Sequence, residues 1–113
     1  MSYGSTAKFE TMRSLAFGSI GAGFTIVGSA FTFPSRVLMV TNLTNQAIIF
    51  SDDGVNNSFI LTSNSAMIID MMTNRTAIDN AQFPKYMGIS AKHNGVAPTS
   101  GAVYVSSVFC KGD

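Results

Sequence analysis

Two adjacent carboxylates, Asp52 and Asp53, are the first residues whose types and spacing suggest chemistry. They lie in the stretch IIFSDDGVNNSFIL, between two apolar runs. Paired carboxylates can serve as general acid and base, whereas a calcium loop needs alternating oxygen ligands and more than two acidic side chains. Adjacent side chains of an extended chain point apart, and Asp53-Gly54 favours a hairpin turn. The stretch predicts a structural turn, with a metal or catalytic role as the alternative.

His93 and Cys110 form a second candidate, because a histidine that lowers the pKa of a thiol can create a nucleophile. No catalytic motif surrounds either residue, and one His and one Cys are too few for a zinc site. We interpret them as a surface histidine and a partly buried structural thiol. Asp70 and Arg75 are interpreted as a salt bridge or as an Asp that caps its own turn. The sequence therefore predicts a protein that is not an enzyme and has no metal or cofactor.

The composition favours burial against other proteins. The chain has 113 residues, of which 46% are apolar and only 12% charged, against about 25% charged in an average soluble domain. Charged residues are depleted at the centres of interfaces, so this surface suits contact with neighbouring subunits. The seven basic residues are scattered and the net charge is +1, which predicts no direct role in nucleic-acid binding. With no long apolar run, no signal core and one cysteine, we expect a single domain made in a cytoplasm, without a membrane span.

Turn residues recur every eight to twelve positions between short β-branched and aromatic runs, a pattern typical of a sandwich or barrel. We therefore predict an all-β, single-domain antiparallel sandwich of about eight strands, jelly-roll-like in type. The expected strands are Arg13–Ser19, Phe24–Ile26, Arg36–Asn42, Ala47–Ser51, Ser58–Thr62, Ala66–Asp70, Tyr86–Lys92 and Ala102–Phe109. The segment from Met71 to Pro84 allows either one helical turn or a long loop.

Two segments depart from simple alternation. In RVLMVTN, from Arg36 to Asn42, both faces are largely apolar, so this strand is expected to be central and covered on both sides. Residues 1–33 are rich in glycine, which costs entropy when it is ordered. We therefore predict that residues 1–33 form an amino-terminal arm that orders only on assembly.

The order of these pieces resembles a known family. The chain contains an arginine, an apolar run and N-x-T (Arg36, Asn42, Thr44), then S-x-D-G (Ser51, Asp53, Gly54), then D-x-x-x-N (Asp70, Asn74). In this pattern it resembles the small accessory virion proteins of tailed bacteriophages. The resemblance covers nearly the whole chain, and it implies a sandwich or jelly-roll fold and a cement, staple or decoration role on a capsid.

From this resemblance and the low charge, we expect a minor structural protein of a phage virion that binds across subunits of the major capsid protein. A homo-oligomer is expected, with a dimer favoured because one patch then serves twice. The alternatives are a head–tail connector, neck or tail ring component, and a carbohydrate- or host-receptor-binding module. The interface candidates are Phe31, Phe33, Arg36, Met71, Met72, Arg75 and Phe83.

Overall fold

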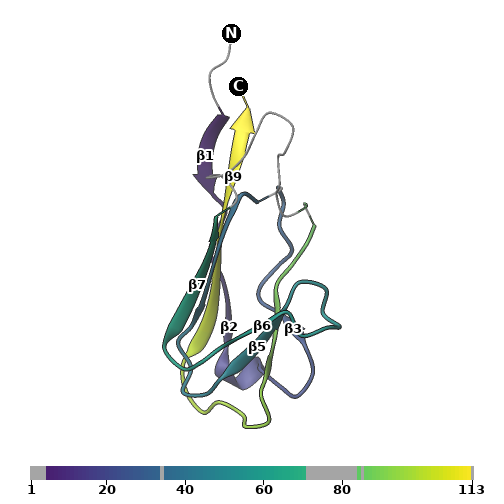
Figure 1. The fold of residues 1–113 in the computed structure, drawn as a ribbon, viewed down its shortest axis with the longest axis vertical. Coiled ribbons are helices and arrows are strands. Elements are labelled where there is room, and N and C mark those ends of the chain that lie inside the picture. Colours follow the sequence, from purple (N-terminus) through teal and green to yellow (C-terminus); the bar gives the residue numbers. More distant parts are fainter. Residues whose placement is uncertain (1–4, 34, 71–83, 85, 113) are drawn as a thin grey trace.

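The computed structural model describes residues 5–33, 35–70, 84 and 86–112; for residues 5–7 and 110–112 it describes the backbone alone. Within these residues the chain forms nine strands and one short 3-10 helix (Figure 1). The elements are β1 (Ser5–Phe9), β2 (Arg13–Ala16), η1 (Phe17–Ser19), β3 (Thr25–Ile26), β4 (Val37–Asn42), β5 (Ile48–Ser51), β6 (Phe59–Leu61), β7 (Ser65–Asp70), β8 (Ser90–His93) and β9 (Ala102–Gly112). All eight predicted strands are present, and β1 was not predicted.

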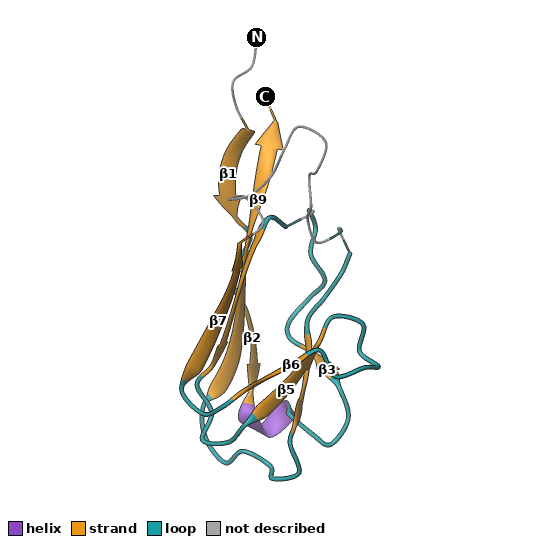
Figure 2. Cartoon of the chain, in the orientation of Figure 1, coloured by secondary structure: helices purple, strands orange, loops and turns teal. Residues whose placement is uncertain are grey.

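The strands form two antiparallel sheets that face each other (Figure 2). The five-stranded sheet has the order β1-β9-β4-β7, with β2 pairing beside β1 along the same side of β9. The four-stranded sheet has the order β3-β8-β5-β6. From β2 to β5, and again from β6 to β9, successive strands alternate between the two sheets, whereas β1 and β2 share one sheet and β5 and β6 share the other. The predicted all-β sandwich is therefore confirmed.

The core lies between the sheets and follows from period-two alternation. In β4, Leu38, Val40 and Asn42 are buried, while Val37, Met39 and Thr41 on the other face are half-buried. The four-stranded sheet contributes Ile48 and Phe50, which are fully buried. Phe50 stacks on Phe59 with ring centroids 5.2 Å apart. β4 is central, as predicted, but no strand among the described residues covers its second face.

Strand β9 is the longest element, and it organises the larger sheet. Its first half pairs with β4 and β2, and its second half pairs with β1 from Phe9↔Val108 to Ser5↔Gly112. The β1–β9 ribbon therefore extends beyond the sandwich at one end (Figure 1). The molecule is elongated as a result, at 53 × 23 × 22 Å.

Much of the described part of residues 1–33 packs into the sandwich, while β1 extends beyond it beside β9, and whether residues 1–33 act as an arm stays a prediction. Val27 and Phe31 are fully buried. The segment that contains them bonds to the chain before β8, through Val27 N–H to Ile89 O at 2.7 Å and Phe31 N–H to Met87 O at 2.8 Å. Gly28 permits close packing, since a Cβ there would lie 2.8 Å from Arg13 Cβ, whereas Gly18, Gly21 and Gly23 have open space around them. Whether the segment orders only on assembly stays a prediction.

Asn42 fixes the corner where the chain leaves β4 and crosses to the other sheet. Its side chain is fully buried, and its Nδ2 lies 2.9 Å from the carbonyl oxygens of Gln46 and Leu61 and 3.1 Å from that of Thr62. Its Oδ1 accepts hydrogen bonds from the backbone N–H and the hydroxyl of Thr44, at 2.9 and 2.7 Å. The side-chain amide of Asn42 thus provides hydrogen-bond partners for backbone groups in two connections between the sheets, the one that follows β4 and the one that follows β6.

Replacing Asn42 by alanine is expected to lower the free energy of unfolding by about 2–4 kcal/mol, because several buried backbone groups lose their partner at once. Urea denaturation measures this loss. The control is Asn57→Ala, since Asn57 lies on an exposed loop. Equal stability of the two variants would contradict the role assigned to Asn42.

Candidate functional site

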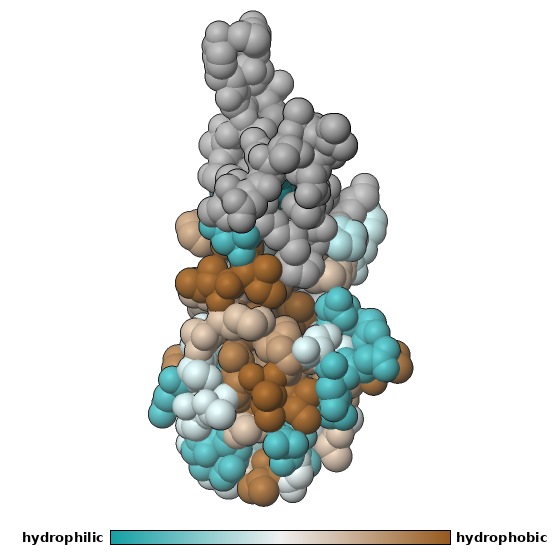
Figure 3. Space-filling view, in the orientation of Figure 1, coloured by the Kyte–Doolittle hydropathy of each residue, from teal (hydrophilic) through white to brown (hydrophobic). Residues whose placement is uncertain are grey.

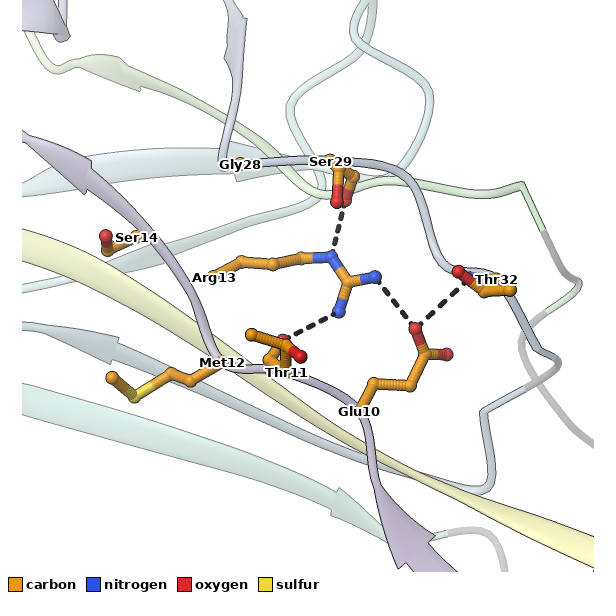
Figure 4. Close-up of a pocket in the computed structure, with 8 residues that line it drawn as sticks. All are labelled: Glu10, Thr11, Met12, Arg13, Ser14, Gly28, Ser29 and Thr32. Atoms are coloured by element: carbon orange, nitrogen blue, oxygen red, sulfur yellow. Dashed lines mark hydrogen bonds and ion pairs between the residues drawn. The ribbon is translucent and has the colours of Figure 1, made fainter.

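The best-formed hollow in the described part of the chain lies beside the link between β1 and β2 (Figure 4). It is an open pocket of about 460 Å³. The β1–β2 link contributes Glu10, Thr11 and Met12, and the first residues of β2 contribute Arg13 and Ser14. The loop after β3 contributes Gly28, Ser29 and Thr32. A buried acid and a buried base line this pocket, so it is the first place to test for chemistry.

The guanidinium of Arg13 is engaged by its own chain. Its Nε donates to Ser29 O at 2.6 Å, its Nη1 to Thr11 O at 3.3 Å, and its Nη2 to both Glu10 Oε1 at 2.8 Å and Ala30 O at 2.9 Å. The group also lies 4.9 Å from the centre of the Phe31 ring. Four donor contacts to fixed acceptors leave this arginine little capacity to bind an anionic ligand. Its chemistry is structural.

Glu10 and Arg13 together form a clamp that holds the loop after β3. Glu10 Oε1 and Oε2 accept the backbone N–H groups of Thr32 and Phe33, each at 3.1 Å, in addition to the ion pair with Arg13. Burial raises the pKa of Glu10, but the hydrogen bonds from Arg13, Thr32 and Phe33 outweigh this effect and lower its pKa below the ordinary value. The carboxylate is thereby held ionised, which suits a fixed ion pair better than a proton-transferring acid.

The acidic pair of the β5–β6 loop forms a turn, as predicted. Asp53 Oδ1 accepts the backbone N–H groups of Val55 and Asn56 at 2.8 and 2.9 Å and the Ser51 hydroxyl at 2.7 Å. These bonds, led by those from Asn56 and Val55, lower the pKa of Asp53 far below its usual range. Gly54 has a φ of +74°, in the left-handed region that glycine favours. In the described residues, no three metal-ligating side chains come together.

Of the other candidate pairs, the structure describes the backbone positions of His93 and Cys110, which lie in different sheets. His93 ends β8 and lies opposite Ile48 in the four-stranded sheet. Cys110 lies opposite Ala7 in the β1–β9 ribbon of the other sheet. Asp70 ends β7 opposite Val37, and its proposed partner Arg75 lies outside the described residues.

The predicted interface residues fall in three kinds of place. Phe31 is fully buried in the core and is not accessible to a partner, so its assignment is wrong. Phe33 is 43% exposed and stacks on Phe109, with ring centroids 4.2 Å apart. Arg36 is buried, and its Nε and Nη2 have no hydrogen-bond partner within the described residues, so it is not a surface anchor. The remaining candidates, Met71, Met72, Arg75 and Phe83, lie outside the described residues.

An open sheet edge is the feature that sequence analysis missed. β7 pairs with β4 and with no other described strand, so within the described residues its outer side is an open sheet edge. Its sequence, SAMIID, contains no Pro, Lys or Gly to block further pairing. The prediction of β7 itself was correct, but its position at an edge depends on strand order, which the sequence does not reveal.

No family model matches the chain, and no curated protein matches it. Among solved structures, it is similar to a protein of Bacillus endospore appendages, described as a novel family of disulfide-linked pili. The TM-score is 0.50 and the identity 10%, over 98% of this chain and 94% of that chain. At this identity the likeness shows the fold, an all-β sandwich in both proteins.

The comparison corrects the predicted function. The expectation of a phage capsid cement protein, with its alternatives in the neck or tail or at a receptor, is contradicted, because the full-length structural match is a pilus protein. The broader expectation of a structural β-sandwich protein is compatible with this match. In the described part of the chain, no helix is long and apolar enough to span a bilayer.

The Glu10–Arg13 clamp predicts a specific dependence of stability on pH. The pKa of Glu10 is lowered in the folded state, so its contribution is present above the unfolded pKa of about 4.3 and is lost as the pH falls through the folded pKa. Glu10→Gln leaves Arg13 buried without a counter-charge and is expected to cost about 3 kcal/mol at neutral pH.

Urea unfolding of wild type and Glu10→Gln at pH 7, 4.5 and 3 (roughly spanning the carboxyl range) measures this effect. The stability gap between the two proteins should be widest at neutral pH and should narrow toward pH 3. Asp52→Asn, at an exposed loop carboxylate, is the control and should show little loss at neutral pH. A gap that stays constant over this range would show that the charge of Glu10 does not matter.

Proposed function

We propose that this chain is a structural subunit that assembles with copies of itself into a pilus-like fibre. The observation that carries the proposal is the open edge of β7. The full-length likeness to a pilus protein supports it, because both chains present the same two-sheet frame. Asp53, which suggested catalysis in the sequence, is engaged in a turn, and the Glu10 and Arg13 of the pocket bind each other, which agrees with a protein that works through its surfaces.

The side of the sandwich that carries β7 is suited to protein contact. β7 and β6 are the last strands of their respective sheets, and they lie on the same side of the molecule. Figure 3 shows hydrophobic side chains across this side, with hydrophilic ones around them. Ile60 of β6 and Ile68 of β7 are 49% and 64% exposed. A strand added here would gain backbone hydrogen bonds and apolar contacts together.

The opposite edge of the same sheet supplies a different surface. There β1 and β2 lie along β9, and neither pairs with a second described strand. Joining the β7 edge of one copy to the β1–β2 edge of the next would continue the sheet from subunit to subunit. Such a head-to-tail contact between two unlike surfaces does not close on itself in general and gives an open helical fibre. Sheet twist supplies the rotation between subunits.

One feature separates this chain from a disulfide-linked polymer. A continuous series of disulfides needs at least two cysteines in each subunit, and these 113 residues contain one, Cys110. A single thiol links chains in pairs only. The fibre that we propose is therefore held along its length by non-covalent contacts.

Fibres treated with hot SDS and no reductant are accordingly expected to release monomers and, at most, dimers. Non-reducing gel electrophoresis measures this, with a reduced sample as the control. A ladder of bands above the dimer that disappears on reduction is not compatible with one cysteine per chain, and it would contradict the non-covalent fibre.

An inward-pointing lysine on β7 is expected to stop fibre growth. Met67 faces the core side of β7 and packs against its margin, so the longer lysine in Met67→Lys must place its ammonium group at the strand edge. A second strand would then bury this charge. Negative-stain electron microscopy and light scattering of the purified protein measure fibre growth.

Met87→Lys is the matched control, because Met87 also packs at the margin of the core but lies outside β7. Wild type and Met87→Lys should form fibres, and Met67→Lys should remain as small soluble species with an unchanged β circular dichroism spectrum. Fibres formed equally well by Met67→Lys would exclude the β7 edge. A wild type that forms no fibres at any concentration would exclude the proposed function.

A further inference from the structure

The outer face of the five-stranded sheet is a second apolar surface, separate from the β7 edge. We use the term outer face for the side that points away from the core, represented by Met12, Met39, Thr41, Leu43, Ile68 and Tyr104. The pairing register places these side chains together: Met39 lies opposite Ile68, and Thr41 lies opposite Tyr104. Because strands alternate, this is the apolar second face of β4 that the sequence predicted to be covered.

The outer face is large and nearly free of charge. Ile68, Met12 and Leu43 are 64%, 58% and 49% exposed. A contiguous apolar patch of more than a few hundred Å² marks a contact site on a monomer, and one partner buries roughly 800 Å² in an ordinary interface. Among the described β4, β7 and β9 residues on this face, Asp70 at one corner is the only charged one.

The face has relief as well as area. A shallow groove of about 400 Å³ is lined by Met12, Met39, Thr41, Leu43, Tyr104 and Ser106. The central strands β4 and β9 form its floor, where Met39, Thr41 and Ser106 are half-buried. Protruding side chains stand on either side of it, Ile68 on β7 and Met12 before β2. A partner with a raised apolar edge and a flat centre would fit this shape.

We propose that the outer face binds the outer face of a second copy of this chain, sheet against sheet about a two-fold axis. A twisted sheet is matched by another sheet of the same twist, and such sheets stack about 10 Å apart. A two-fold axis sets the raised side chains of each copy over the groove of the other, so each feature is used twice. With so little charge on the face, the pairing carries little cost of burying ions.

This pairing deepens the proposed function. The outer face meets the β7 edge at Ile68, but the residues that test the two contacts differ. Fibre growth through sheet edges would align the outer faces of successive subunits along one side of the fibre. Two such fibres would then pair laterally, face to face. The β7 edge and the outer face can be tested separately, because Met67 points inward and the residues of the outer face point outward.

The oligomeric state is measured by sedimentation equilibrium in the Met67→Lys protein, where fibre growth does not interfere, and also in the wild type if that protein forms no fibres. The parent should dimerise at micromolar concentration. Adding Met12→Lys, or in a second variant Met39→Lys, should weaken the dimer roughly tenfold or more, since each buries an unpaired ammonium group. Met12 lies outside the strands, so its variant keeps the test valid if Met39→Lys does not fold.

Val55→Lys is the matched control, because it adds the same charge at an apolar side chain that is 75% exposed on the β5–β6 loop. It should dimerise like its parent. A parent that stays monomeric, or face variants that dimerise as tightly as the control, would overturn the paired outer face and leave the fibre proposal standing. Fibres that fail to form while the dimer persists would overturn the fibre proposal alone.

Discussion

The guanidinium of Arg13 makes the contact on which the joining of the two sheets depends. After β3 the chain crosses from the four-stranded sheet to the five-stranded sheet. In this crossing the backbone carbonyls of Ser29 and Ala30 accept hydrogen bonds from Arg13. Apolar side chains cannot satisfy these groups, so the closure of the sandwich here requires a buried hydrogen-bond donor, which the Arg13 guanidinium supplies. Glu10 then supplies the counter-charge that makes this cation tolerable. Gly28 completes the arrangement, since a Cβ there would come within 2.8 Å of Arg13 Cβ.

Asn42 meets the same requirement at the other end of the sandwich with a neutral group. Both residues are polar and buried, and both bond to the backbone. The buried polar residues thus serve to close the sandwich. The surfaces left for contact with other molecules are the sheet edges and one apolar sheet face.

The strands could be predicted because their signals are local. Alternation and turn residues marked eight of the nine, and Asp53-Gly54 marked the loop between β5 and β6. The ninth, β1, has the short polar sequence STAKF and is a strand only because β9, about a hundred residues later, pairs with it. The same limit explains Phe31, which looks like an exposed aromatic before Pro34 until its bond to Met87 places it in the core. Strand order, and hence the free edge of β7, is beyond any local pattern.

The pairing of β9 also determines when this molecule can form during its synthesis. In the five-stranded sheet, β9 lies between β4 on one side and β1 and β2 on the other, yet it follows all of them in the chain. The earlier strands therefore leave the ribosome before the strand that joins them exists. Folding must wait for residues 102–112, and the long loops it closes make it slow. A nascent chain thus cannot complete the β1–β2 edge of the larger sheet, which would delay growth of the proposed fibre until synthesis has passed β9.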